Sequence, residues 1–170
     1  MNIFCIYNDP IESAIHLVDK HVSKMVLESA QMLANCFTKE QLAASDCPRT
    51  KNGTVRKHSY FNHPCSIWTR ASRDNMRWLI AHAKAMDKER MARSLLKGEP
   101  TAVPHFCIDF INWVEENLGS STVAEGGLTK FAQAMPDEFK CEDSVSAYRH
   151  LYKVGKAHLH TWTRNKPDWI

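Results

Sequence analysis

The chain has 170 residues, 44% of them hydrophobic and 24% charged, with a formal net charge of +3. These values are typical of a globular protein with a sizeable core, and they exclude a disordered chain. No apolar run approaches the roughly 20 residues needed to cross a bilayer, and no secretory signal opens the sequence, so no membrane association is expected. Six cysteines without a C-x-x-C pair favour free thiols over a disulfide scaffold.

The N-terminal region is predicted to be an extended segment followed by a long helix. Residues 2–7 form a short strand or a buried extended segment in this prediction. Asp9 and Pro10 then favour a helix start, because aspartate caps a helix and proline suits its first turn. The helix is expected to run from Pro10 to Phe37, with a bend near Asp19.

A polar stripe is predicted on the helix that follows Asp19. His21, Lys24, Glu28 and Gln31 are spaced three, four and three residues apart, which confines them to an arc of roughly 80°. The rest of the helix is apolar, so the stripe is expected to line a site. We predict that His21, Lys24 and Glu28 are catalytic and that Gln31 binds substrate. The alternative is a set of side-chain pairs at a partly solvated interface.

The remainder of the chain is predicted to form a basic, flexible connection and three more helices. The connection spans residues 38–62, with turns at 47–48 and 52–53. The helices are expected at 63–96, 104–118 and 143–162, and Gly98 and Gly119 end the first two. The predicted fold is therefore all-α, a single helical domain over residues 1–170 with a short N-terminal extended segment.

The helix expected near residue 63 begins with polar side chains. Free N–H groups and the positive end of the helix dipole favour an anion there. Asn62, His63, Trp68 and Arg70 are therefore predicted to bind substrate. His-Pro is also an ordinary helix start, which leaves plain capping as the alternative.

Two further regions carry candidate binding residues. Gln133 and Asp137 lie in a polar loop, where Gln133 is predicted to read a base edge and Asp137 to act as acid, base or cap. On the last helix, basic side chains lie beside aromatic ones, a pattern that suits DNA phosphates and unstacked bases, although tyrosines at this spacing also fit a core. The predicted DNA-binding residues are Tyr148, Arg149, Tyr152 and Lys156.

No metal site and no cofactor site is predicted. The sequence contains no H-E-x-x-H motif, no zinc-deaminase signature, no P-loop and no G-x-G-x-x-G. His158 and His160 are too close in sequence to act as two ligands on one helix face.

Several motifs carry a resemblance to known families. Over most of its length the chain resembles a family of small tailed-bacteriophage proteins, through DKHVSKMVLESAQML, NHPCSIW, AMPDEFK, SAYRHLYKVGKAH and WTRNKPDW. This resemblance implies a protein that acts in the cytoplasm of an infected bacterial host. In helix order and in the D-x-H start of its first long helix, the chain also resembles the phage pyrimidine-dimer DNA glycosylases of the endonuclease V type.

The second resemblance implies a chemistry for the polar stripe. Those glycosylases are compact helical proteins that kink DNA, flip a nucleotide and attack with an N-terminal amine assisted by a glutamate. The resemblance implies that Glu28 corresponds to that glutamate. Here Met1 precedes Asn2, a bulky residue after which the initiator is usually kept. Lys24, with its pKa lowered by burial, is therefore expected to supply the imine-forming amine.

The expected function is DNA-base processing on a flipped-out pyrimidine. The first hypothesis is a hypermodifying transferase that joins an amino acid or similar amine to an activated 5-hydroxymethyluracil, because some phages modify thymine-derived bases in this way. The alternatives are a pyrimidine-specific DNA glycosylase/lyase in repair and a non-catalytic phage nucleotide-binding or inhibitor protein. The expected partners are DNA and a free amino acid co-substrate, and the chain is expected to be a monomer or a homodimer.

Overall fold

The computed structural model describes residues 1–170 and contains helices but no strand. The all-α prediction is therefore confirmed. The seven α-helices are α1 (Pro10–Ile15), α2 (Asp19–Ala34), α3 (Lys39–Ala43), α4 (Pro64–Thr69), α5 (Arg73–Leu96), α6 (Ile108–Glu116) and α7 (Ser144–His150). The shorter helical turns are η1 (Leu118–Ser120), η2 (Asp137–Phe139), η3 (Leu151–Gly155) and η4 (Ala157–Leu159).

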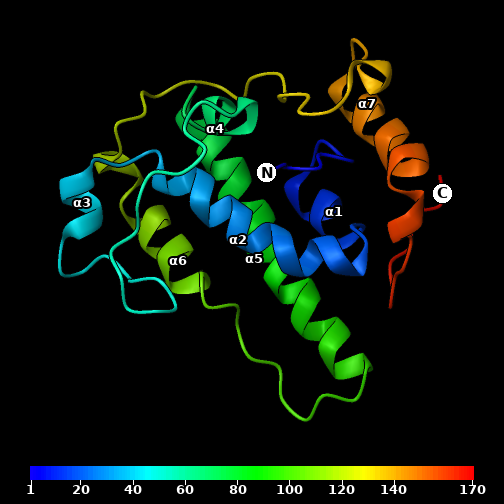
Figure 1. Cartoon of the computed structure of the whole chain (residues 1–170), viewed down its shortest axis with the longest axis horizontal. Helices are drawn as coiled ribbons and strands as arrows, with labels where there is room; N and C mark the ends of the chain where they lie inside the picture. Colours follow the sequence, from blue (N-terminus) through cyan, green and yellow to red (C-terminus); the bar gives the residue numbers. More distant parts are fainter.

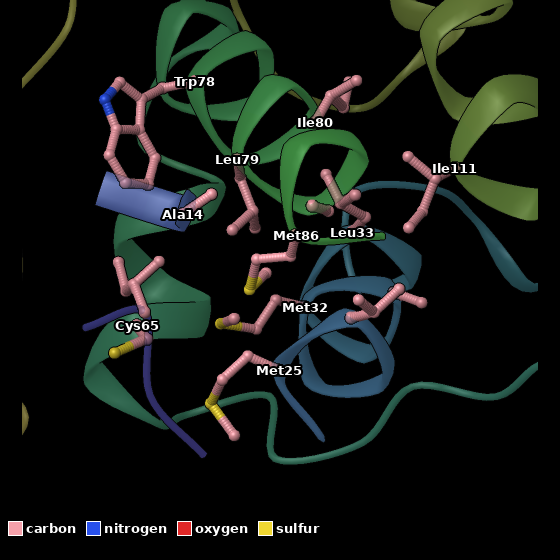
Figure 2. Close-up of a cluster of buried hydrophobic side chains, with 14 of the residues drawn as sticks. Ala14, Met25, Met32, Leu33, Cys65, Trp78, Leu79, Ile80, Met86 and Ile111 are labelled. Atoms are coloured by element: carbon pink, nitrogen blue, oxygen red, sulfur yellow. The ribbon is translucent and has the colours of Figure 1, made fainter. Parts of the chain in front are cut away.

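Helices α2 and α5 cross at the centre of the molecule, and α1, α4 and α6 pack around them (Figure 1). Figure 2 shows Met25 and Met32 of α2 lying close to Leu79 and Met86 of α5. All four side chains are buried, so the apolar face of α2 forms one wall of the core. None of the helices combines the length and the apolar character that a membrane span requires.

The prediction of one long helix from Pro10 to Phe37 is wrong, because the chain is not helical between α1 and α2. The backbone carbonyls of Ile15 and Leu17 accept hydrogen bonds from the guanidinium of Arg93, at 2.7 and 2.8 Å. Side-chain donors from α5 thus satisfy carbonyls at the end of α1. The bend predicted near Asp19 is a complete break.

The helix predicted over 63–96 is also interrupted, between α4 and α5. Ser72 caps α5, because its hydroxyl accepts a hydrogen bond from the backbone N–H of Asn75. The Asn75 side chain donates to the carbonyl of Trp68 at 2.6 Å, which satisfies a carbonyl in the last turn of α4. A residue pair that favours caps and turns therefore overrides the apolar periodicity here.

The connection at 38–62 is more ordered than the sequence predicts. It contains α3, which begins with a capping box between Thr38 and Gln41. The guanidinium of Arg56 is buried over the ring of Phe110, 4.2 Å from its centroid. These contacts fix a segment that was expected to be flexible.

The C-terminal helix is shorter than predicted. Helix α7 ends at His150 and continues only as the wide turn η3 and the short turn η4. Beyond them the chain is extended, and the indole N–H of Trp162 donates to the carbonyl of His16 at 2.9 Å. The last residues therefore lie as a strap against the junction of α1 and α2.

Candidate active site

Three segments that are distant in sequence meet at the N-terminal residues. Glu28 of α2 contacts the backbone nitrogens of residues 1 and 2, the hydroxyl of Ser66 on α4 donates to the Met1 sulfur at 3.4 Å, and the Asn2 side chain donates to the carbonyl of Ala134 at 2.8 Å. Figure 1 shows the N-terminus at this central position, beside α2 and α4. The structure thus brings together the first long helix, the NHPCSIW motif and the first residue of AMPDEFK.

The centre of this cluster is the carboxylate of Glu28, whose residue is 8% exposed. One carboxylate oxygen lies 3.6 Å from the amine nitrogen of Met1 and accepts a hydrogen bond from the backbone N–H of Asn2 at 2.9 Å. The other lies 3.3 Å from the ammonium of Lys24. One carboxylate therefore faces two amines, an arrangement that leaves a net positive charge and suits an anionic ligand.

The position of the first two residues is fixed by the side chain of Asn2. Its carbonyl oxygen accepts hydrogen bonds from the backbone N–H groups of Ile3 and Phe4, at 2.8 and 3.2 Å. Phe4 then adopts a left-handed backbone conformation, with φ of 49°. This local turn directs the amine nitrogen of Met1 toward α2.

Lys24 and Gln31 lie on the predicted stripe, but Lys24 is not buried. Its side chain is 62% exposed, so the burial expected for it is wrong. Gln31 lies one turn beyond Glu28 and is half-buried. Lys24, Glu28 and Gln31 follow one face of α2, as the spacing predicts.

His21 lies elsewhere. Its ring is 5% exposed, stacks on Phe4 with centroids 4.1 Å apart, and is joined to the hydroxyl of Tyr152 at 2.5 Å. Burial, together with the charges of Lys156 and Lys24, lowers the pKa of His21 to about 3. The neutral ring belongs to an aromatic cluster, so the expected catalytic role is replaced by a packing role.

His63, a predicted substrate-binding residue, lies close enough to the cluster for the charges of the Met1 amine and Glu28 to act on it. It caps α4, and its ring nitrogen accepts a hydrogen bond from the backbone N–H of Cys65 at 3.2 Å. Burial lowers the pKa of His63, and the positive charge of the Met1 amine lowers it further, against the opposing effect of Glu28. Asn62, beside it, is exposed.

Trp68 is a core residue, and its burial contradicts the prediction that it contacts substrate. It is 4% exposed, lies against Phe131 and Trp78, and its indole N–H points to the carbonyl of Thr129 at 3.4 Å. Arg70 remains partly exposed at the end of α4.

The two loop candidates have structural partners. The amide of Gln133 exchanges hydrogen bonds with the backbone of Cys141, at 2.6 and 3.1 Å, and so closes the loop between them. Asp137 is exposed and pairs with Lys140 at 2.7 Å, which lowers the pKa of Asp137. Ala134, rather than either candidate, makes the recorded contact with the N-terminal residues.

The tyrosines predicted to bind DNA are fully buried, which corrects that expectation. Tyr148 donates to the carbonyl of Ala132 at 2.7 Å and thereby holds the segment that meets Asn2. Tyr152 is the partner of His21. Arg149 donates to the carbonyl of Ile6 and lies over the ring of Tyr7. Lys156 is half-buried in the turn that follows.

The sequence favours Lys24 over the N-terminal amine as the imine-forming group, whereas the structure places the amine nitrogen of Met1 in the cluster. The available signal was the apolar run Ile3–Ile6, which is short, buried and preceded by only two residues, so burial of the run also places those residues against the core. An amine beside a carboxylate is a pair that can form an imine and move protons. No group of three or more His, Cys, Asp and Glu side chains is arranged to hold a metal ion.

Comparison with known proteins identifies a family model that the chain matches. Residues 1–99 match the family model described as pyrimidine dimer DNA glycosylase. The chain has no significant match among curated proteins or solved structures. The matched region includes the N-terminal residues, the polar stripe of α2 and all of α4 and α5. The chain belongs to the pyrimidine dimer DNA glycosylase family.

Proposed function

We propose that this protein excises a pyrimidine from DNA, as a glycosylase with a lyase step, through an amine held beside Glu28. One observation carries the proposal: the Glu28 carboxylate lies 3.6 Å from the amine nitrogen of Met1 and 3.3 Å from that of Lys24. Family membership supports the same reaction class. An amine and a carboxylate within reach of each other are the groups that imine-forming excision needs.

The α-amine is the better nucleophile of the two. Its nitrogen is held beside the Glu28 carboxylate by the turn at Asn2, whereas the Lys24 side chain is 62% exposed. The backbone nitrogen of Asn2 lies 2.9 Å from the same carboxylate oxygen. Removal of Met1 would therefore leave an α-amine at Glu28. Lys24, largely exposed, is suited to holding a DNA phosphate.

The reaction begins when the uncharged amine attacks C1′ of the deoxyribose. The bond from C1′ to the pyrimidine breaks, and the base leaves with the electron pair and takes a proton from solvent. Glu28 accepts the proton that the amine loses and passes it to O4′ as the C1′–O4′ bond breaks, so that the sugar ring opens to a protonated imine and the carboxylate is free again. Transfer of a C2′ proton to Glu28 then expels the 3′ phosphate, and water hydrolyses the imine to free the amine.

Family membership favours this excision over the hypermodifying transferase expected first from the sequence. A transferase would join an amino acid to an activated 5-hydroxymethyluracil and leave the strand intact. A non-catalytic nucleotide-binding protein would leave both base and strand unchanged. The three functions therefore differ in product.

The test is an assay on an end-labelled duplex with one pyrimidine dimer and on a 5-hydroxymethyluracil duplex supplied with amino acids. The native chain should break one glycosidic bond of the dimer, whose two pyrimidines stay joined to each other, and should cut that strand. Glu28→Gln should lower the rate at least about 100-fold, because acid–base groups contribute this much. DNA affinity should change little. Glu115→Gln removes an exposed carboxylate on α6 and is the matched control.

Each other result has a distinct meaning. A heavier nucleoside that requires an amino acid would establish the transferase. DNA binding without any product would establish the binding protein. Equal cutting by Glu28→Gln and the native chain would remove Glu28 from the mechanism.

A further inference from the structure

An exposed aromatic segment lies just before α4. Tyr60 is 67% exposed and Phe61 43% exposed, although most large apolar side chains of the chain are buried. The backbone of Tyr60 has φ of 48°, a conformation that is costly for a bulky side chain. Solvent exposure and backbone strain at the same residue indicate a role in binding rather than in packing.

The segment is held in place from both sides. The amide of Asn35, at the end of α2, exchanges hydrogen bonds with the backbone of Ser59, at 2.8 and 3.1 Å. The guanidinium of Arg70 donates to the carbonyl of Phe61 at 2.7 Å and lies 3.4 Å from the centroid of its ring. His58 is bonded to the carbonyl of Phe37 at 2.8 Å. The backbone of the segment and the ring of Phe61 are therefore preorganised, and a ligand need not order them.

An open groove of about 700 Å³ is lined by the Phe61 ring, next in sequence to Tyr60. Its lining combines apolar side chains with basic ones and includes no acid. The lining residues are Lys39, Val55, Arg56, Lys57, His58 and Phe61. A basic groove with an aromatic wall is the chemistry that single-stranded nucleic acid requires: cations for the phosphates and a ring face for each base.

The aromatic segment is tied to the C-terminal end of the helix that carries Glu28. Asn35, which holds Ser59, is seven residues beyond Glu28 on α2, which corresponds to about 10 Å along the helix, or about three base-pair steps of DNA. One DNA strand can therefore reach both places.

We infer that Tyr60, Phe61 and the adjoining groove form a binding site for unpaired nucleotides of DNA, with a base stacked on the Tyr60 ring and phosphates held by Lys39 and Lys57. The inference rests on the proposed function for the identity of the ligand as DNA. It adds a second contact region, separate from the reacting residues, that binds unstacked bases. Opening of the duplex around the target is thereby stabilised.

The test measures binding of a fluorescent single-stranded oligonucleotide of about ten thymidines in the Glu28→Gln background, where no chemistry is expected. Tyr60→Gly removes the ring and relieves the backbone strain, so this variant should fold. It should weaken binding about tenfold, because one base stacked on an aromatic ring contributes this order of affinity. Tyr60→Phe should bind within about twofold of the parent, since the stacking face remains.

Leu96→Ala is the matched control, because Leu96 is 62% exposed at the far end of α5 (Figure 1). It should leave binding unchanged. Lys57→Ala should reduce the slope of log affinity against log salt by about 0.7, the value for one phosphate contact on a single strand. Full binding by Tyr60→Gly, or equal losses in Tyr60→Gly and Leu96→Ala, would overturn the inference. Tyr60-dependent binding by a chain that never cuts DNA would refute the excision proposal alone.

Discussion

At the scale of single residues, two histidines are buried in their neutral form. Neither ring nitrogen of His82 has a hydrogen-bond partner, and the ring stacks on Trp78 with centroids 4.8 Å apart. Burial lowers the pKa of His82 to about 3, as it does that of His21. The unfolded chain binds a proton at each histidine below about pH 6.5, whereas the folded chain does not until about pH 3. Both histidines therefore stabilise the fold fully above pH 6.5 and progressively less as the pH falls.

His82→Phe should make the fold less sensitive to acid. Between pH 6.5 and 4.5, where most carboxylates remain charged, removing one such histidine should reduce the slope of unfolding free energy against pH by about 1.4 kcal/mol per unit. Stability at pH 7.5 should change by no more than about 1 kcal/mol, because the stack on Trp78 is kept. Urea unfolding across this pH range measures both quantities. His158→Gln, at an exposed position, is the control, and an unchanged slope in His82→Phe would contradict the account.

At the scale of elements, buried charges fasten the C-terminal strap to α2 and α5. The carboxylate of Glu89 is 1% exposed and accepts hydrogen bonds from Arg93 at 2.8 Å and Arg164 at 2.6 Å. Asp19, at the start of α2, pairs with Arg93 and accepts from the backbone N–H and hydroxyl of Thr163. Burial opposes ionisation of Asp19, but these bonds and one from Lys97 outweigh it and lower its pKa to about 2.

Glu89→Ala should destabilise the fold by about 3 kcal/mol, because it leaves the buried guanidinium of Arg93 with only part of its partners. Arg164→Ala removes the outer partner, whose side chain is 42% exposed, and should cost no more than about 1 kcal/mol. Denaturant unfolding of the two variants gives the comparison. A larger loss in Arg164→Ala than in Glu89→Ala would show that the strap, rather than the buried pair, supplies the stability.

At the scale of the whole molecule, the match to the family ends at residue 99, but residues beyond 99 complete the packing of the matched region. Buried residues of the first half are covered by the second half: Phe4 and His21 by Tyr148 and Tyr152, and Glu89 by Arg164. A fragment of residues 1–99 should therefore lack a cooperative thermal transition, whereas the full chain has one. A near-ultraviolet circular dichroism spectrum with the same sharp transition in both would contradict this.

The sequence predicts local features of this molecule well and long-range ones poorly. The spacing of polar residues correctly predicts that Lys24, Glu28 and Gln31 share a face of α2, because helical periodicity is local. Whether His21 faces solvent or the tyrosines of the last helix depends on residues about 130 positions away, for which periodicity carries no signal. For the same reason, the contact between the Met1 amine and Glu28 could not be predicted from periodicity. The break before Asp19 depends on tertiary hydrogen bonds from Arg93 to backbone carbonyls. The break at Ser72 is local, because Ser72 and Asn75 cap the helix ends there, and apolar periodicity does not register such caps.

The central claim is that an amine beside Glu28 becomes bonded to DNA, and reductive trapping tests it most directly. The native chain, its first residue identified by intact mass, is incubated with a dimer-containing duplex and sodium borohydride, which would reduce an imine to a stable bond. Peptide mapping by mass spectrometry then locates the attached sugar. The account predicts attachment at the α-amine of the first residue and loss of the adduct when that amine is acetylated. Attachment at Lys24, or no adduct on a strand that is cut, would contradict it.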